Sequence, residues 1–358
     1  MSAWTYLALA LAAAVLALGT TALARRIAIA TAFLDRPAGR KDHGEAVPYL
    51  GGAAVVLVLL ALPSAGLLAA SGNFAGVPGI AEGALRELAA AGHAWGGLAL
   101  GLLIACIGGT WDDRAKLAPR AKLALQLAAA LCPILLGDLR FDWALHELLG
   151  ASGAALWIVA AMNAFNFLDN MNGVLAGVVA ALALPFFALA LALDQVAIAA
   201  TLAVTCGACL GFLPFNFPRA RIFLGDGGSQ ALGYWIGALA VQASYLGPGT
   251  RCALAPFLVP PALLALPLLD LAHVVWSRRR LGVPISRGDH RHVSHRLAQR
   301  TGSKRNAALA CWGATLALGA LAALLPWCTP LEAGAVVATQ IALFLWVGGL
   351  PPRATRSH

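Results

Sequence analysis

The chain has 358 residues, of which 60% are hydrophobic and only 11% are charged, and its mean hydropathy is +0.78. Because soluble domains carry about 25% charged residues, this composition excludes an ordinary globular protein and indicates a polytopic membrane protein. The net charge of +9 would indicate a nucleic-acid-binding protein only if the charges gathered on one soluble face.

Apolar segments of about 20 residues, the length that one membrane-spanning helix needs, recur along the chain. The first of them, 3–24, is followed by Arg25 and Arg26, whereas a signal peptide carries its positive charges before the apolar region. We therefore predict an all-α membrane protein that forms one domain over 1–358. The eleven predicted spans are 3–24, 49–71, 94–111, 120–137, 151–168, 174–193, 195–213, 230–247, 253–276, 307–325 and 331–350.

Lysine and arginine residues fall almost entirely on one side of this topology. Alternating spans place every Lys and Arg except Arg86, Arg140 and Arg251 on the same side of the membrane. The positive-inside rule makes that side cytoplasmic and places the N-terminus outside the cytoplasm. The positive charge is thus a topology signal, and no nucleic-acid partner is expected.

Five polar clusters interrupt the apolar pattern, and all of them lie on the predicted cytoplasmic side. Because unrelated polar residues would scatter over both faces, this grouping indicates a site at the cytoplasmic surface. In chain order the clusters are LDRPAGRKDHGEAVPYLGG at 34–52, GGTWDDRAKLAPRAK at 108–122, NAFNFLDNMNG at 163–173, NFPRARIFLGDGGSQALG at 216–233 and SRGDHRHVSHRL at 286–297.

Asp112 and Asp113 follow the third predicted span. Adjacent residues on a helix point about 100° apart, so the two carboxylates are expected to do different jobs. An acid is also disfavoured at a helix C-terminus, where the helix dipole is negative. A solvated helix boundary is the alternative, but the disfavoured placement and the cations that follow favour a functional site.

The segment 163–173 places Asn163, Asn166, Asp169 and Asn172 at steps of three, which keeps neighbours on one side of a helix. Carboxylate and amide oxygens without sulfur are suitable ligands for a hard cation such as Mg²⁺, and polar contacts between helices are the alternative. Asp226, in a Gly-rich turn, adds a further acid where the backbone can approach an anion closely.

The last cluster carries Arg291, His292, His295 and Arg296, whose side chains suit phosphate or sugar hydroxyl groups. Zinc is a weaker interpretation, because no Cys and no third well-placed His support it. A basic loop that serves topology alone is the other alternative. Together the five clusters bring acids, amides, glycine turns and cations to a membrane surface, a combination that suits phosphoryl transfer.

In this order the clusters resemble the polyprenyl-phosphate N-acetylhexosamine-1-phosphate transferase family, which includes phospho-MurNAc-pentapeptide translocase. The resemblance runs from about residue 34 to 298. The family's motifs fall on Lys41 and His43; on Asp112, Asp113 and Gln126; on Asn163, Asn166, Phe167 and Asp169; on Phe223, Gly225, Asp226, Gly228 and Ser229; and on Pro267 and Asp270. The chain departs from the family's Asp-Gly-x-Asp-Gly pattern at Asn170 and Asn172, and from its His-x-His-His pattern at Ser294.

The resemblance implies transfer of GlcNAc-1-phosphate, or of another N-acetylhexosamine-1-phosphate, from a UDP-sugar to undecaprenyl phosphate, with release of UMP. Such a reaction starts the synthesis of a cell-envelope polysaccharide, for example the O-antigen of lipopolysaccharide, at the bacterial cytoplasmic membrane. Mg²⁺, or Mn²⁺ in its place, is expected on Asp226 with Asn166 or Asp169. Asp112 or Asp113 would orient the lipid phosphate or take its proton, in a single displacement or through a covalent aspartyl phosphate. The implied substrate-binding residues are Lys41, His43, Asn163, Asp169, Arg291, His292, His295 and Arg296.

The rival functions are a secondary transporter, an inactive membrane scaffold and, within the family, a phospho-MurNAc-pentapeptide transferase. Asp270 is the acid that lies clearly inside a predicted span, which is too little for a transport pathway. The intact acids of the motifs argue against a scaffold. Release of UMP from a UDP-sugar would exclude the transporter and the scaffold. The sequence is compatible with a homodimer and does not identify the sugar.

Overall fold

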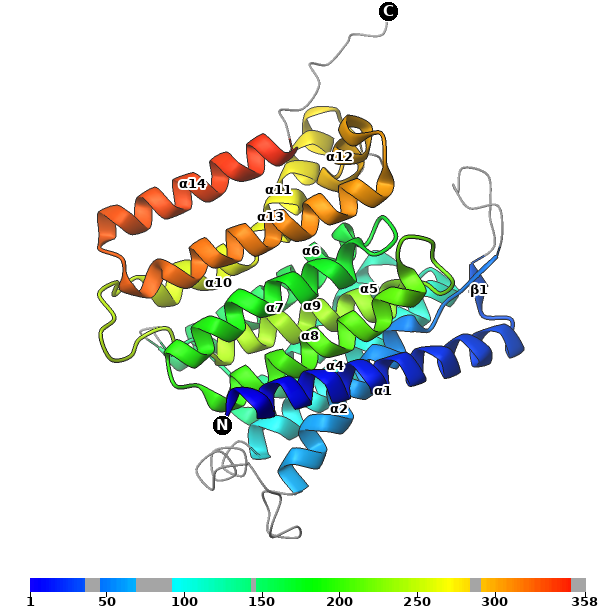
Figure 1. Ribbon diagram of the computed structural model, residues 1–358, viewed down its shortest axis with the longest axis horizontal. Coiled ribbons are helices and arrows are strands. Elements are labelled where there is room, and N and C mark those ends of the chain that lie inside the picture. Colours follow the sequence, from blue (N-terminus) through cyan, green and yellow to red (C-terminus); the bar gives the residue numbers. More distant parts are fainter. Residues whose placement is uncertain (36–45, 69–91, 143–145, 284–290, 349–358) are drawn as a thin grey trace, which may run out of the picture.

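The computed structural model describes residues 1–35, 46–68, 92–142, 146–283 and 291–348, which fold as a bundle of α-helices (Figure 1). The predicted all-α class is therefore confirmed. The helices are α1 (Ala3–Ala30), α2 (Gly51–Leu68), α4 (Gly92–Ala115), α5 (Pro119–Gly137), α6 (Glu147–Leu168), α7 (Val174–Ala192), α8 (Val196–Asn216), α9 (Gly225–Gln242), α10 (Ala255–Leu263), α11 (Ala265–Arg280), α12 (Val293–Thr301), α13 (Lys304–Leu324) and α14 (Pro330–Gly348). A 3₁₀ turn, Leu325–Trp327, follows α13, and two short strands, β1 (Leu34–Asp35) and β2 (Val47–Pro48), pair antiparallel.

Within these described ranges, nine helices are long and apolar enough to cross a membrane. α10 and α11 together make a tenth candidate that is bent by 75°, so the span predicted at 253–276 is a broken one. The bend follows Pro260 and Pro261, whose missing N–H groups interrupt the helical hydrogen bonds. α9 begins at Gly225, ahead of the predicted span 230–247, and its polar first turns keep it out of this set. The count of eleven spans stays a prediction, and so does the assignment of one side of the bundle to the cytoplasm.

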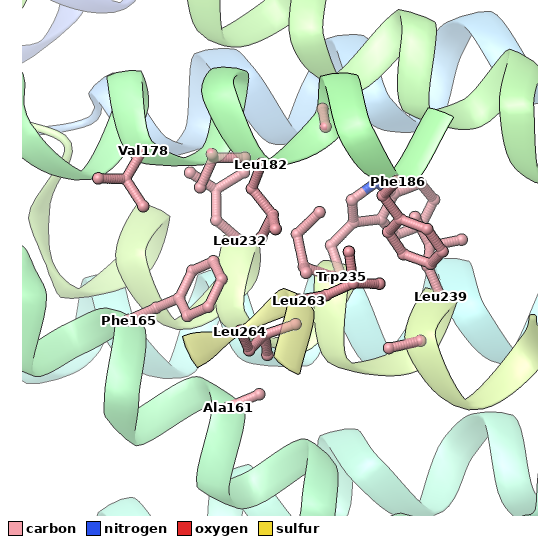
Figure 2. Close-up of a cluster of buried hydrophobic side chains, with 14 of the residues drawn as sticks. Ala161, Phe165, Val178, Leu182, Phe186, Leu232, Trp235, Leu239, Leu263 and Leu264 are labelled. Atoms are coloured by element: carbon pink, nitrogen blue, oxygen red, sulfur yellow. The ribbon is translucent and has the colours of Figure 1, made fainter. Parts of the chain in front are cut away.

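α9 is the central helix of the bundle and packs against α2, α4 and α6. Its residues Leu232, Trp235 and Leu239 meet side chains of α6, α7 and the α10–α11 break in one buried cluster (Figure 2). Trp235 is fully buried, and its indole N–H donates to Thr205 Oγ1 of α8 at 2.9 Å. Because lipid chains are as apolar as these side chains, close packing and hydrogen bonds hold such helices together in a membrane.

The polar clusters gather at one end of the bundle, as the sequence predicts. The last turns of α4 and α6, the first turns of α9 and α12, and the β1–β2 pair meet there, at the right-hand end in Figure 1. The N-terminus of α1 lies at the opposite end. Lys41 and His43 of the first cluster lie outside the described residues.

Candidate active site

Lys122, near the start of α5, links three polar residues from three other helices. Its ammonium lies 2.8 Å from Asp112 Oδ2 of α4, 2.6 Å from Asp226 Oδ2 of α9 and 3.2 Å from Asn166 Oδ1 of α6. The turn after α4 supports this arrangement, because Leu117 N–H donates to Asp112 Oδ1 at 2.7 Å. One cation is thus held between two carboxylates, which offsets the cost of partly burying all three charges.

Asp113, one residue further along α4, has different partners. Its Oδ1 accepts Asp226 N–H at 3.0 Å, and its Oδ2 accepts Gly227 N–H at 3.3 Å. The carboxylate therefore caps the N-terminus of α9, where the helix dipole favours negative charge. The two neighbouring acids diverge as predicted. The dipole of α4 disfavours a carboxylate at its C-terminus. The N-terminus of α9 offsets this effect, because its dipole and N–H groups stabilise the Asp113 carboxylate.

Two glycines let α4 and the start of α9 approach this closely. Gly225 has a φ of +74°, which glycine adopts at little cost, and a Cβ there would lie 2.5 Å from Asp113 Oδ2. A Cβ on Gly109 would lie 2.3 Å from the Asp226 carbonyl oxygen. A larger side chain at either position would push the Asp113 carboxylate away from the α9 backbone.

The first residues of α2, together with the strand β2 before it, close over the same turn. The N–H groups of Gly51 and Gly52 donate to the carbonyl oxygens of Phe223 and Leu224 at 3.0 and 2.9 Å. Phe223 N–H in turn donates to Pro48 O at 2.8 Å. These backbone bonds join the first polar cluster to the fourth, although the described helices α4 to α8 lie between them along the chain.

Asn163 and Asn166 both come from α6 but occupy different layers. Asn166 Nδ2 donates to Asp226 Oδ1 at 2.9 Å, beside the Lys122 contact described above. Asn163 Nδ2 donates to Gln126 Oε1 at 2.9 Å, and Gln126 Nε2 donates to the buried Gln230 at 3.1 Å. Asn163 therefore belongs to a layer of amides behind the carboxylates.

A cavity of about 440 Å³, here called the acidic cavity, opens beside these carboxylates. Its lining includes the acidic residues Asp35, Asp113, Asp169 and Asp226, together with Asn170, Asn172, His295 and Lys304. Burial, and then the charges of Asp226 and Asp113, raise the pKa of Asp169 to about 8. Like charges that raise this pKa also favour the binding of a cation in the cavity.

α12 brings one residue of the predicted histidine loop to the acidic cavity and holds another behind it. His295 lines the cavity. His292 is 5% exposed, and its Nδ1 lies 2.8 Å from Oδ2 of Asp270, which is fully buried in α11. Asp270 Oδ1 also accepts Val293 N–H at 2.7 Å. One carboxylate thus holds both the imidazole ring and the first turn of α12.

The charge of the acidic cavity fits a divalent cation, and its oxygen ligands fit one in part. Asp226 and Asn166 lie side by side, and Asp169 lines the same cavity. In the part of the chain that the structure describes, no three His, Cys, Asp or Glu side chains are grouped so that they could hold a metal ion. Mg²⁺ usually binds through one or two carboxylates together with waters and substrate phosphates.

The sequence patterns did not assign the roles of Lys122 and Asp270. Lys122 counted as one of a run of cations, although its place inside the predicted span 120–137 marks it as an intramembrane charge. Asp270 matched a motif, but nothing near it in the sequence indicates His292 as its partner. Arg291 and Arg296 flank the stretch that contains His292 and His295. Neither arginine is among the described residues that line the acidic cavity.

Fold and site together define a helical membrane protein with an acidic cavity beside Lys122 at one end of its bundle. The model of glycosyl transferase family 4 matches residues 95–244, which carry Asp112, Asp113, Asp169 and Asp226. The chain is 30% identical to the probable undecaprenyl-phosphate N-acetylglucosaminyl 1-phosphate transferase of Bacillus subtilis, over 77% of this chain and 73% of that protein.

Two further relatives extend the comparison. The chain is 30% identical to the decaprenyl-phosphate N-acetylglucosaminephosphotransferase of Mycolicibacterium smegmatis, over 94% of this chain and 86% of that protein. A shorter stretch is 47% identical to the phospho-N-acetylmuramoyl-pentapeptide-transferase of Moorella thermoacetica, over 25% of this chain and 28% of that protein. The chain belongs to glycosyl transferase family 4, so the resemblance drawn from its motifs is confirmed.

Proposed function

We propose that the protein transfers N-acetylglucosamine-1-phosphate from a UDP-sugar to a polyprenyl phosphate and releases UMP. The observation that carries this proposal is the Lys122 ammonium held between Asp112 and Asp226 beside the acidic cavity. A cation, a helix N-terminus and several carboxylates suit a diphosphate with its metal ion better than an uncharged solute. The relatives named for undecaprenyl and decaprenyl phosphate support a polyprenyl acceptor.

In this reaction an oxygen of the lipid phosphate bonds to the β-phosphorus of the donor. The bond from that phosphorus to the bridging oxygen breaks, and UMP leaves with that oxygen. Lys122, which contacts Asp226 at the edge of the acidic cavity, would neutralise the charge that develops on the leaving group. Asp113 lines the acidic cavity and is the acid that would face the lipid phosphate, whereas Asp112 holds Lys122 in position. A phosphate monoester loses its second proton with a pKa of about 6, so base catalysis contributes modestly at neutral pH.

Asp226, with Asn166 or Asp169, would hold Mg²⁺. The bound ion would supply Lewis-acid stabilisation of the diphosphate. The site lies where α4 and α6, both apolar enough to span, come to an end. A lipid phosphate can reach it from the bilayer and a nucleotide sugar from the aqueous phase, which we assign to the cytoplasm of a bacterium.

A panel of donors tests the proposal. Purified protein in lipid nanodiscs is supplied with undecaprenyl phosphate, Mg²⁺ and either UDP-GlcNAc, UDP-GalNAc or UDP-MurNAc-pentapeptide, and both UMP and the lipid-linked product are measured. We expect UMP release from UDP-GlcNAc that requires the lipid and is lost in Asp226→Asn. Turnover of the pentapeptide donor alone would favour the function of the Moorella relative. If no donor yields UMP, a transporter or a scaffold would be the remaining functions.

A further inference from the structure

Asn170 and Ser294, which lie far apart in the chain, meet beside the acidic cavity. The Ser294 hydroxyl, in the first turn of α12, donates to Asn170 Oδ1 in the loop after α6. Asn170 Nδ2 donates to Phe167 O at 2.9 Å, which ties the amide back to the end of α6. Ser294 is fully buried. A buried hydroxyl and a side-chain amide therefore fasten the start of α12 to α6.

This contact holds a segment whose neighbours face the acidic cavity. Asn170 and its neighbour Asp169 line the cavity, and Ser294 directly precedes His295, which also lines it. The first turn of α12 has a second attachment through Asp270, which holds His292. α12 has only nine residues and also packs against α13 and α14, so these two attachments fix its first turn, which carries His295.

The same two residues are positions at which the chain departs from the family's motifs. The usual patterns place a glycine at position 170 and a histidine at position 294, whereas this chain places Asn and Ser there. The larger side chain is thus on the loop rather than on α12. The two positions are in contact, so the two departures lie at one place in the structure.

We propose that Asn170 and Ser294 act as one positioning pair that sets the place of His295 in the acidic cavity and thereby the binding of the nucleotide-sugar donor. The effect on donor binding rests on the proposed function. The contact between the two residues does not, and it can be measured separately through thermal stability.

A double-mutant cycle tests the pair. Ser294→Ala and Asn170→Ala each remove the bond between them, so each is expected to raise the donor KM about threefold to tenfold, the effect of one net hydrogen bond. The double variant should lose no more than Asn170→Ala alone, because the shared bond can be lost only once. The KM for the lipid phosphate should not change. Thr315→Val is the matched control, since it removes a buried hydroxyl in α13 that donates to Cys311 O within the same helix.

An exchange of side chains gives a second, independent test. Ser294→His places a large ring at a fully buried position that faces Asn170, so it should lower both Tm and activity. Asn170→Gly removes the facing amide. The double variant Asn170→Gly with Ser294→His should therefore recover a part of both quantities that Ser294→His alone has lost.

The outcomes decide between the pair and its alternatives. Additive losses in the alanine cycle, or a lowered Tm with unchanged donor kinetics, would overturn the positioning role. If the wild-type protein releases no UMP from any donor, the proposed function fails. The shifts in Tm alone then test the contact between Asn170 and Ser294. Additive Tm shifts for positions 170 and 294 would overturn the pair in that case, and non-additive shifts would support it.

Discussion

The Lys122 ammonium lies 2.6 Å from Asp226 Oδ2, although Asp226 comes 104 positions later in the chain. Both side chains remain partly accessible, with 22% of Lys122 and 32% of Asp226 exposed. This ion pair sets α5 against α9 at the edge of the acidic cavity. It explains why cations follow the aspartate pair in the sequence: one of them closes the site.

Lys122→Ala should lower turnover by at least about a hundredfold, because it removes charged hydrogen bonds worth about 1.5–3 kcal/mol each and leaves Asp112 and Asp226 without their common cation. Lys122→Arg should recover only a part of the loss, since a planar guanidinium does not reproduce a point charge held by three oxygens. UMP release is the measurement. Lys116→Ala, at an exposed neighbouring cation, is the control, and an equal loss there would show that the general charge of the segment matters rather than Lys122.

Asp112→Asn and Asp113→Asn should have different effects. Asp112→Asn weakens the hold on Lys122 and should mainly lower kcat. Asp113→Asn leaves a backbone N–H of α9 facing an amide NH₂ group, so it should also lower the free energy of unfolding by about 1–3 kcal/mol. Thermal unfolding in detergent, measured beside UMP release, checks this. Identical mild losses in both variants would mean that the pair is only a helix boundary.

Gly225→Ala should be more damaging than a second glycine substitution with the same backbone strain. Gly225 and Gly249 have φ values of +74° and +75°, so alanine costs about 1–2 kcal/mol at either position. A Cβ at Gly225 also meets Asp113 Oδ2, whereas at Gly249 nothing lies within 4 Å. We expect Gly225→Ala to lose activity and Gly249→Ala to keep it, with Tm lowered in both. Equal activities would show that the Asp113 cap is not needed.

Asp270→Asn should act through His292. The substitution removes the charge that holds Nδ1, so the donor KM should rise and kcat should fall by about tenfold to a hundredfold, as in His292→Ala. The double variant should be no worse than His292→Ala, because both changes remove one arrangement. Asp138→Asn is the control, since Asp138 is exposed at the end of α5. Independent, multiplying losses would contradict a role of Asp270 through His292.

Removal of the metal ion should abolish turnover. We expect EDTA to stop UMP release and Mg²⁺ or Mn²⁺ to restore it, because carboxylates alone cannot neutralise a diphosphate. Asp226→Asn should need a much higher Mg²⁺ concentration for any residual activity. Full activity in EDTA would remove the metal from the proposal and leave Lys122 as the cation of the site.

Much of this architecture could be predicted from local patterns. Apolar runs of helical length indicate spans wherever they occur, and the polar clusters were expected at one end, where the described ones lie. The break at the α10–α11 pair was not predicted, because hydropathy alone does not distinguish a straight helix from a bent one. Pro260 and Pro261 were the signal that could have indicated it. Helix geometry alone predicted that the side chains of Asp112 and Asp113 would point in different directions.

The partners of these residues were decided by the tertiary structure. Asp113 caps α9, Asn163 lies behind the carboxylates, Asp270 holds His292, and Ser294 reaches Asn170. Each contact joins segments that are remote in sequence, and periodicity reports only which face of its own helix a residue occupies. By itself the sequence determined that polar groups would gather at one end of a membrane bundle. Which of them touch was decided by the close approach of α4, α6, α9 and α12, because a hydrogen bond extends only about 3 Å.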